Sequence, residues 1–546
     1  MEDLLIYNAK IYSLEKEGEN FSAMTIKNGR ITELYPDNPP LDCIRKMSRN
    51  SIDAENQTIL PGLIDSHMHF VMTVAMSVLS TPISVYQDGE FSPKNLAEVK
   101  EIIKTNSQVS SKSTPLIFNN YVIPTIEENR LPTRMELDQW APNRLITIIA
   151  IDGHSFSLSS EGLRKLGINP ENHDGILNED MEEFNMDKLV NLFTSTLNIK
   201  LLVEGIQKTI NSAIDKGLVG LHCLEGFQDD PSADLSLKVM KLVGRKIPLK
   251  LRLYPQVKHV SKLNPYFKKM RSRRIGGCGA WDMDGAVGAK TAAFEKPYLG
   301  GSDNYGSLLL TKDEIFPLMY AAQSSGTQIT THAIGTTAIN ELLEAHTLLK
   351  TEFGIDTKNL RHRIDHFEFP TKEAIDRAIT DLDLLIVPQP GFNWVDANYP
   401  GMNTYNKFLD PEIVQRQNPM KTIIGKGGII CGSSDSPVQS LDPWLQIHGM
   451  VNFPIESERI SIYEALRTYT YNGAYATFEE NDRGTIKSGK YADFIMLSQD
   501  PFDTNPENLL YIKVNKTFIN GIELKKTNLA PIPYLVKLLF SKTNLI

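Results

Sequence analysis

The sequence predicts an α/β protein, a (β/α)8 barrel with insertions joined to a smaller sheet structure made from both chain ends. Three observations favour this fold. Short apolar runs alternate with helical patterns over much of the chain, both ends carry strand pairs separated by Asn-Gly, and histidines stand where several apolar runs end. Alternating β and α elements predict parallel strands flanked by helices, and this many units fit a closed barrel better than an open sheet.

Two hairpins are predicted near the ends of the chain. Residues 23–34 alternate apolar and polar side chains on either side of Asn28-Gly29, and residues 514–524 repeat the pattern around Asn520-Gly521. Asn-Gly favours a type I′ turn, which needs positive φ at both central positions. A lone hairpin is marginal in water, so we expect the two ends to pair. Two separate peripheral hairpins are the alternative.

Strand-like runs and helical patterns alternate between the predicted hairpins. A doubly wound sheet is the alternative to a barrel, but no GxGxxG follows the first strand. Residues 392–408 lack clear periodicity and are expected to form a long loop, in which Trp394 lines a substrate pocket or packs the loop onto the barrel. The strand-like runs are 116–123, 145–151, 218–223, 249–254, 328–332, 362–366, 384–388 and 428–432, with helical patterns at 313–322 and 337–345.

Composition excludes several classes of protein. The chain has 546 residues, 41% of them hydrophobic, and a net charge of −9. A mildly acidic chain without a basic block is a poor candidate for binding nucleic acid, which needs clustered cations. The N-terminal residues do not resemble a secretory signal, and no apolar run reaches the roughly 18 residues of a spanning helix. We therefore expect neither nucleic-acid nor membrane association.

The four cysteines are Cys43, Cys223, Cys278 and Cys431, and they lie far apart in the chain. Dispersed cysteines in a large chain favour reduced thiols over a disulfide framework or a zinc knuckle. They predict a cytoplasmic protein.

The candidate site begins with a histidine pair. His67 and His69 follow Leu60-Pro-Gly-Leu-Ile-Asp-Ser, and residues i and i+2 of a strand face the same side. Both imidazoles could therefore hold one metal ion at the end of the strand. A pair of this kind also arises by chance, so it is weak evidence alone.

Three further residues strengthen the metal hypothesis. His332 ends the run 328–332, His366 ends 362–366, and Asp435 follows the run 428–432. Each is a potential ligand or base at the end of a buried-looking strand. Neutral imidazoles with a nearby carboxylate suit a borderline divalent cation, so the set predicts a metal site.

These residues carry a resemblance to a known family. HxH after Pro-Gly, followed by His, His and Asp on later strands, resembles the amidohydrolase superfamily of metal-dependent hydrolases. The chain is most similar to the subgroup that includes N-substituted formamide deformylase. The further matching stretches are 152–155, 174–179, 284–293, 434–438, 465–474 and 489–494.

The resemblance implies a metal-bearing barrel over residues 59–482 and a small β-sandwich domain formed by residues 1–58 and 483–546. It implies that His67 and His69 bind a first ion. His332 and His366 would bind a second ion, or one of them would polarise the substrate carbonyl beside a single ion. Asp435 would be both ligand and general acid/base. Zinc is the expected metal, with iron, manganese or cobalt as alternatives.

One departure from the family puts the number of ions in doubt. Many relatives have a lysine four residues before the Asp-Gly of this motif, and that lysine, once carboxylated, bridges two metals. Here Ala280 stands four residues before Asp284. Cys278 or Asp282 could substitute if the local register shifts, since thiolate and carboxylate are both competent ligands. A loop without any ligand is the alternative.

The expected reaction is hydrolysis of a small molecule's C–N bond (amide, N-formyl or cyclic imide) by attack of metal-bound hydroxide. His154 follows a predicted strand and is expected either to orient substrate or to form a structural hydrogen bond. An ester or lactone hydrolase and a non-catalytic scaffold are the alternative functions. The expected partner is a small-molecule substrate, and a homo-oligomer is compatible with the sequence.

Overall fold

Parallel strands form two sheets in the middle of the chain. The computed structural model describes residues 2–540 except 41–42, 44–45, 47, 88–89, 113, 152, 154, 179–180, 182–187, 190–191, 194–196, 227–233, 245–246, 264–271, 301–302 and 400–401. It is an α/β protein, as predicted. One sheet has the order β17-β16-β8, with β8 (Leu63–Met68), β16 (Leu218–Glu225) and β17 (Lys250–Pro255). The other has the order β18-β19-β20-β21, with β18 (Arg274–Asp282), β19 (Gln328–Ala333), β20 (Arg363–His366) and β21 (Leu385–Val387).

A segment at residues 429–436 connects the two parallel sheets. On one side the N–H of Cys431 donates to the carbonyl of Ile386 over 2.8 Å. On the other side Asp435 N–H donates to His67 O over 2.9 Å. The segment therefore lies between β21 and β8, so the strand that carries the histidine pair is a direct neighbour of Asp435.

Helices pack around the parallel strands and bury a large shared core. Local sequence starts several of them. The side chain of Asn198 caps the first turn of α7, and Thr311 with Glu314 forms a capping box at α10. These helices are α2 (Phe70–Leu79), α7 (Ile199–Asp215), α8 (Leu235–Val243), α10 (Lys312–Ser324), α11 (Thr336–Phe353), α13 (Lys372–Asp376), α17 (Met420–Gly425), α18 (Pro443–Val451), α19 (Ile462–Thr468) and α20 (Tyr471–Ala476).

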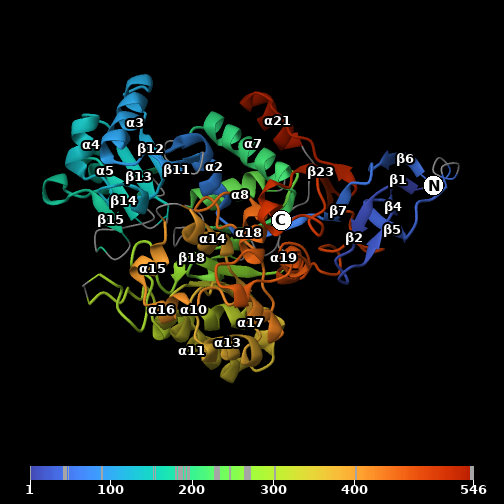
Figure 1. Ribbon diagram of the computed structural model, residues 1–546. Coiled ribbons are helices and arrows are strands. Elements are labelled where there is room, and N and C mark those ends of the chain that lie inside the picture. Colours follow the sequence, from blue (N-terminus) through green and yellow to red (C-terminus); the bar gives the residue numbers. More distant parts are fainter. Residues whose placement is uncertain are drawn as a thin grey trace.

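The apolar runs at 116–123 and 145–151 do not join these parallel sheets. They form β12 (Leu116–Tyr121) and β13 (Ile146–Ala150) of a separate five-stranded sheet inserted between β8 and β16. It lies with its helices at one end of the molecule, opposite the N-terminal strands (Figure 1). The strands of this sheet bury apolar side chains in a hydrophobic core of their own. Their local sequence pattern is therefore the same as that of the parallel strands in the middle of the chain. The other members are β9 (Ser80–Pro82), β14 (Ser155–Leu158), β15 (Ile176–Asn178), α3 (Leu96–Val109), α4 (Arg134–Trp140) and α5 (Ser160–Leu166), with the hairpin β10 (Val85–Gln87) and β11 (Glu90–Ser92) nearby in sequence.

Both predicted hairpins are confirmed. Asn28 and Gly29 have φ of 50° and 75°, and Asn520 and Gly521 have φ of 52° and 73°, as a type I′ turn requires. The first hairpin joins β4 (Ala23–Lys27) to β5 (Arg30–Tyr35) in a four-stranded sheet with β1 (Glu2–Tyr7) and β6 (Ser48–Asp53). The second joins β23 (Val514–Ile519) to β24 (Ile522–Glu523) in a different, six-stranded sheet.

The six-stranded sheet unites the two ends of the chain. Its order is β24-β23-β22-β7-β2-β3, so β22 (Phe494–Leu497) pairs with β7 (Thr58–Pro61), beside β2 (Lys10–Tyr12) and β3 (Asn20–Phe21). Apolar side chains from both terminal sheets share one core. Only Gly62 separates β7 from β8, so this sheet continues directly into the strand of the histidine pair.

The expected loop at 392–408 is wrong, because the segment contains helices α14 (Pro390–Asn398) and α15 (Thr404–Phe408). Part of the buried face of α14 is polar. Asn393 donates to Glu368 and Gln417, and Asp396 accepts from the backbone of Thr404. Polar residues at buried positions remove the apolar periodicity by which a helix is recognised in sequence.

The C-terminal helix α21 (Pro531–Phe540) packs against α7, where Tyr534 is buried. Within the described part of the chain, no helix combines the length and the apolar character needed to cross a membrane.

Candidate metal centre

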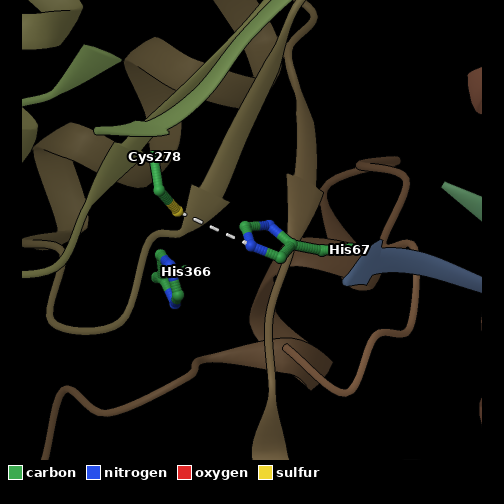
Figure 2. Close-up of side chains that lie close together, drawn as sticks. All are labelled: His67, Cys278 and His366. Atoms are coloured by element: carbon green, nitrogen blue, oxygen red, sulfur yellow. Dashed lines mark hydrogen bonds between the residues drawn. The ribbon is translucent and has the colours of Figure 1, made fainter. Parts of the chain in front are cut away.

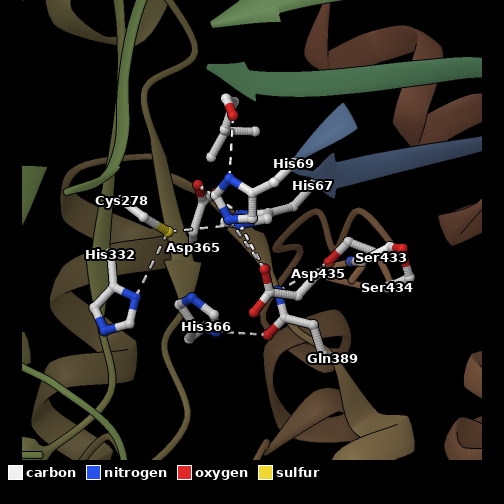
Figure 3. A network of polar contacts seen from close by, with 12 residues as sticks. His67, His69, Cys278, His332, Asp365, His366, Gln389, Ser433, Ser434 and Asp435 are labelled. Atoms are coloured by element: carbon white, nitrogen blue, oxygen red, sulfur yellow. Dashed lines mark hydrogen bonds and ion pairs between the residues drawn. The ribbon is translucent and has the colours of Figure 1, made fainter. Parts of the chain in front are cut away.

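The five predicted ligands converge at the ends of β8, β19 and β20 and in the 429–436 segment (Figure 3). Ring centroids lie 5.3 Å apart for His67 and His69, 5.4 Å apart for His67 and His366, and 4.3 Å apart for His332 and His366. His67 and Asp435 contact through Nε2 and Oδ1 at 3.2 Å. The structure thus brings together residues from four separate parts of the sequence.

The first group of candidate ligands is His67, His69 and Asp435. One ligand atom from each lies within 4.8 Å of the others. Asp435 Oδ1 is 3.2 Å from His67 Nε2 and 3.3 Å from His69 Nε2. Two atoms each about 2.1 Å from one tetrahedral ion lie about 3.4 Å apart. The donor set and its spacing therefore fit a divalent ion.

The rings of His67 and His69 are each oriented by an acceptor behind them. His67 Nδ1 is 3.0 Å from Asp365 Oδ2, and His69 Nδ1 donates to the carbonyl of Leu224 over 3.1 Å. A proton held on Nδ1 leaves the lone pair on Nε2, which in both rings faces Asp435. Carboxylates and carbonyls play this orienting role for metal-binding histidines.

The other two histidines are oriented in the same way. His366 Nδ1 donates to Gln389 Oε1 over 2.7 Å, and His332 Nε2 lies 3.4 Å from the carbonyl oxygen of Gly285. His366 Nε2 is buried and has no hydrogen-bond partner among the described residues. A buried imidazole nitrogen without a partner is costly unless something binds there. Taken with the contacts of His67 and His69, each of the four histidines has an acceptor group of the protein beside one of its two ring nitrogens.

The second group of candidate ligands is Cys278, Asp282 and His332, again with ligand atoms within 4.8 Å of one another. Strand β18 shifts register against β19, since Gly277 pairs with Thr331 but Asp282 pairs with His332. The shift that the sequence interpretation required is present. It brings both candidate substitutes for the missing lysine to the centre.

The backbone is unusual at two of the predicted ligands. His366 has φ of 70° and Asp435 has φ of 56°, which is the left-handed region that residues other than glycine rarely adopt. Each such residue costs about 1–3 kcal/mol, and such strain gathers at functional sites. At the end of β20 it turns the side chain of His366 out of the regular alternation of the strand.

The charges of the site favour ionised carboxylates. Burial disfavours an ionised Asp435, but the neighbouring His67 and His69 outweigh it and hold its pKa well below the usual range. Burial also opposes protonation of His67, yet Asp365 and Asp435 raise its pKa well above the usual value, so an ion bound at Nε2 would displace a proton from this ring. Burial lowers the pKa of His366 to about 4, so this imidazole is neutral near pH 7 and can offer a lone pair.

Sequence reasoning missed Asp365, Gln389 and the structural role of Asp284. Asp365 is fully buried between His67 and Arg363, whose guanidinium donates to it over 2.8 Å. Asp284 accepts three backbone N–H groups, from Ala293, Ile334 and Gly335, and so fixes the end of β19 beyond His332. The sequence feature that could have identified Asp284 is its place in the Asp-Gly motif. The feature that could have identified Asp365 is its position directly before a candidate ligand.

The two predicted substrate-binding residues have different outcomes. His154 lies outside the described residues. Trp394 on α14 packs edge-on against His448 of α18 with ring centroids 4.5 Å apart, and its ring centroid is 5.8 Å from that of Tyr399. Trp394 thus packs against α18, and its expected role in substrate binding stays a prediction.

Comparison with known proteins gives a match over most of the chain. The model of the family described as "Amidohydrolase family" matches residues 50–523. The chain is 24% identical to N-substituted formamide deformylase of Arthrobacter pascens, with 96% of this chain and 98% of that protein covered. It is 23% identical to Protein LONG AFTER FAR-RED 3 of Arabidopsis thaliana, with 96% and 91% covered.

Solved structures show the same fold. An uncharacterised metal-dependent hydrolase from Pyrococcus horikoshii matches with a TM-score of 0.70 and 20% identity, over 92% of this chain and 99% of that one. A second, from Pyrococcus furiosus, matches with a TM-score of 0.67 and 23% identity, over 92% and 100% of the two chains.

Proposed function

Because the chain belongs to the amidohydrolase family, we propose that it is a metal-dependent hydrolase that cleaves a C–N bond of a small molecule. The observation that carries this proposal is the arrangement of the four histidines. In each ring one nitrogen has an acceptor in the protein, which leaves the second nitrogen for a ligand at the shared centre. The four rings also lie together at one place, which packing of separate core histidines does not require.

His67, His69 and Asp435 would hold one divalent ion, and His332 and His366 would hold a second. Imidazole and carboxylate donors suit zinc first, and iron, manganese or cobalt as alternatives. A divalent ion in such a site polarises a carbonyl and lowers the pKa of a water molecule to about 7.

The protein's own groups supply the remaining chemistry. The carboxylate of Asp435 is ionised and stands at the centre, so it can accept the proton of the attacking water and deliver it to the leaving nitrogen. Where only one ion is present, His366 could polarise the substrate carbonyl only in its protonated form, because its Nδ1 proton is donated to Gln389. Asp365 and Gln389 keep His67 and His366 in the required orientation.

Two relatives support the proposed substrate class. One acts by name on N-substituted formamides, and a shorter match, 26% identical over 148 residues, is named as a deaminase of methylthioadenosine and adenosylhomocysteine. Both names describe cleavage of a C–N bond. We therefore propose an amide, an N-formyl amine or a cyclic imide as substrate.

The test combines metal content with a substrate panel. Protein purified without chelator is analysed for metals and assayed with N-formyl amines, amides and cyclic imides beside lactones and esters. We expect at least one transition-metal ion per chain and turnover of the C–N compounds. Asp435→Asn should lower kcat by at least about 100-fold, whereas Asp303→Asn, at an exposed position, should not. Turnover of esters or lactones alone, or the absence of bound metal, would contradict the proposal.

Three further inferences concern the architecture and the location of the protein. We infer that the parallel strands and the 429–436 segment close into a (β/α)8 barrel, because that segment bonds to β21 on one side and β8 on the other. We also infer that the two terminal sheets form a β-sandwich around their shared core. All four cysteines are free thiols, which supports a cytoplasmic location.

A further inference from the structure

The thiol of Cys278 lies between His67 of the first group of candidate ligands and His332 of the second. Its Sγ atom is 3.7 Å from His67 Nε2 and 4.0 Å from His332 Nδ1. It also shares a group with His67 and His366 in which the ligand atoms lie within 4.8 Å of one another. Figure 2 shows the sulfur directed towards His67, with the ring of His366 nearby.

The backbone around Cys278 is built to place it there. The register shift between β18 and β19 leaves residues 278–281 without strand partners, so they bulge from the sheet. Gly276 and Gly277 enter the bulge with φ of 103° and 125°, values that side-chain-bearing residues rarely adopt. A Cβ atom on Gly276 would lie 2.0 Å from the carbonyl oxygen of Thr330. The bulge therefore depends on glycine.

The distances fit coordination. A sulfur about 2.3 Å and a nitrogen about 2.1 Å from one tetrahedral zinc ion lie about 3.6 Å apart. The distance of 3.7 Å from Sγ to His67 Nε2 is close to that value, and the distance of 4.0 Å to His332 Nδ1 is slightly longer. His67 and His332 would bind different ions of the proposed centre. His366 Nε2 provides independent support, because it is buried and has no hydrogen-bond partner in the described part of the chain.

We propose that Cys278 is a bridging ligand whose thiolate binds both ions, one held by His67, His69 and Asp435 and the other by His332 and His366. This inference rests on the proposed function. Metal binding releases the thiol proton to solvent, and the sulfur then donates to both ions. Cys278 would thus take the place of the lysine that many relatives have near this point, and the thiolate favours zinc or cobalt over magnesium.

The test is cobalt substitution of the full-length protein. The Co(II) form should show a sulfur-to-cobalt charge-transfer band in the near ultraviolet and two ions per chain. Cys278→Ser should abolish the band and weaken binding of at least one ion by about 100-fold, since even residues that only orient ligands cost 10–100-fold. Cys43→Ser is the matched control and should keep both, because Cys43 lies between β5 and β6 of the four-stranded terminal sheet and not among the parallel strands that carry the candidate ligands.

A second measurement needs no variant. Iodoacetamide labels exposed thiols, and Cys278 is partly exposed whereas Cys223 and Cys431 are fully buried. Bound metal should slow labelling of Cys278 by at least about tenfold and leave Cys43 unaffected. A band that survives Cys278→Ser, or equal labelling with and without metal, would overturn the bridge while leaving a metal-dependent hydrolase intact. Failure of the wild-type protein to bind any transition metal would instead overturn the proposed function.

Discussion

His67 Nδ1 and Asp365 Oδ2 lie 3.0 Å apart, and both side chains are fully buried. Asp365 is held in turn by Arg363, which is also buried. Asp365 thus lies against one ring nitrogen of His67, and the other, Nε2, lies 3.2 Å from Asp435 Oδ1. A buried carboxylate outside the first group of candidate ligands therefore contacts one of its members.

Asp365→Asn should weaken metal binding at this group by about 10–100-fold, because an amide orients the imidazole less strongly and makes it a poorer donor. A competition titration against a chromophoric chelator measures the change. Asp303→Asn is the exposed control. Because Arg363 loses its charged partner, circular dichroism should first show that the variant is folded. Unchanged affinity in the folded variant would mean that Asp365 serves only to pair Arg363.

Removal of metal should lower the melting temperature. An ion at a concentration 100 times its Kd stabilises the folded state by about 2.7 kcal/mol, and that contribution disappears on chelation. Differential scanning calorimetry before and after chelation, and after addition of zinc, measures the change. His67→Asn should lose this response, whereas His259→Asn, at an exposed position, should retain it. An identical melting temperature in all three states of the wild type would argue against a bound ion.

Glu15 should stabilise the protein in a pH-dependent manner. Burial opposes its ionisation, but hydrogen bonds from Lys487 and Thr485, together with Lys490, outweigh burial and lower its pKa to about 2. Its pKa in the unfolded chain is near the ordinary 4.5. Because the folded-state value is the lower one, the stabilisation is complete above about pH 4.5 and declines as the pH falls towards 2.

Glu15→Gln should therefore cost about 1 kcal/mol of unfolding free energy at neutral pH and less in acid. Urea unfolding of chelator-treated protein at about pH 6 and pH 3.5 measures this difference without a contribution from metal loss. Glu17→Gln, at an exposed neighbouring position, should show no such pH dependence. A cost at Glu15 that stays constant with pH would contradict the assignment.

Gly276→Ala should destabilise the protein by more than the cost of positive φ alone. That cost is about 1–3 kcal/mol, and here the new Cβ would also meet Thr330 O at 2.0 Å. Gly18→Ala is the matched control, since Gly18 has φ of 76° but nothing within 4 Å of the added atom. Urea unfolding compares the two variants. Equal losses would show that the bulge can shift to accommodate a side chain.

Local patterns in the sequence were enough for the hairpins and for much of the site. Asn-Gly specifies the backbone of a turn by itself, and alternation in a strand placed His67 and His69 on one side. Both statements depend only on neighbouring residues. The same reasoning could not assign β12 and β13 to the inserted sheet, because their apolar pattern is the same in either location.

Asp365 shows where such reasoning stops. It directly precedes His366, and regular alternation would place the two on opposite faces of the strand. Positive φ at His366 breaks that alternation, and both side chains serve the same centre. For Cys278 the sequence left three possibilities open, namely Cys278, Asp282 or no ligand, for a related reason. Its position depends on how β18 is paired with β19, a long-range choice that spacing along the chain does not record.

Pairing of β7 with β22 also has a consequence for biosynthesis. β7 leads through Gly62 into the strand of His67, but its partner, β22, emerges from the ribosome only after nearly all of the central region has been made. Until then one edge of β7 is unpaired, and folding must wait for a contact between distant parts of the sequence, which is intrinsically slow. The nascent chain should therefore depend on chaperones until its final strands are translated.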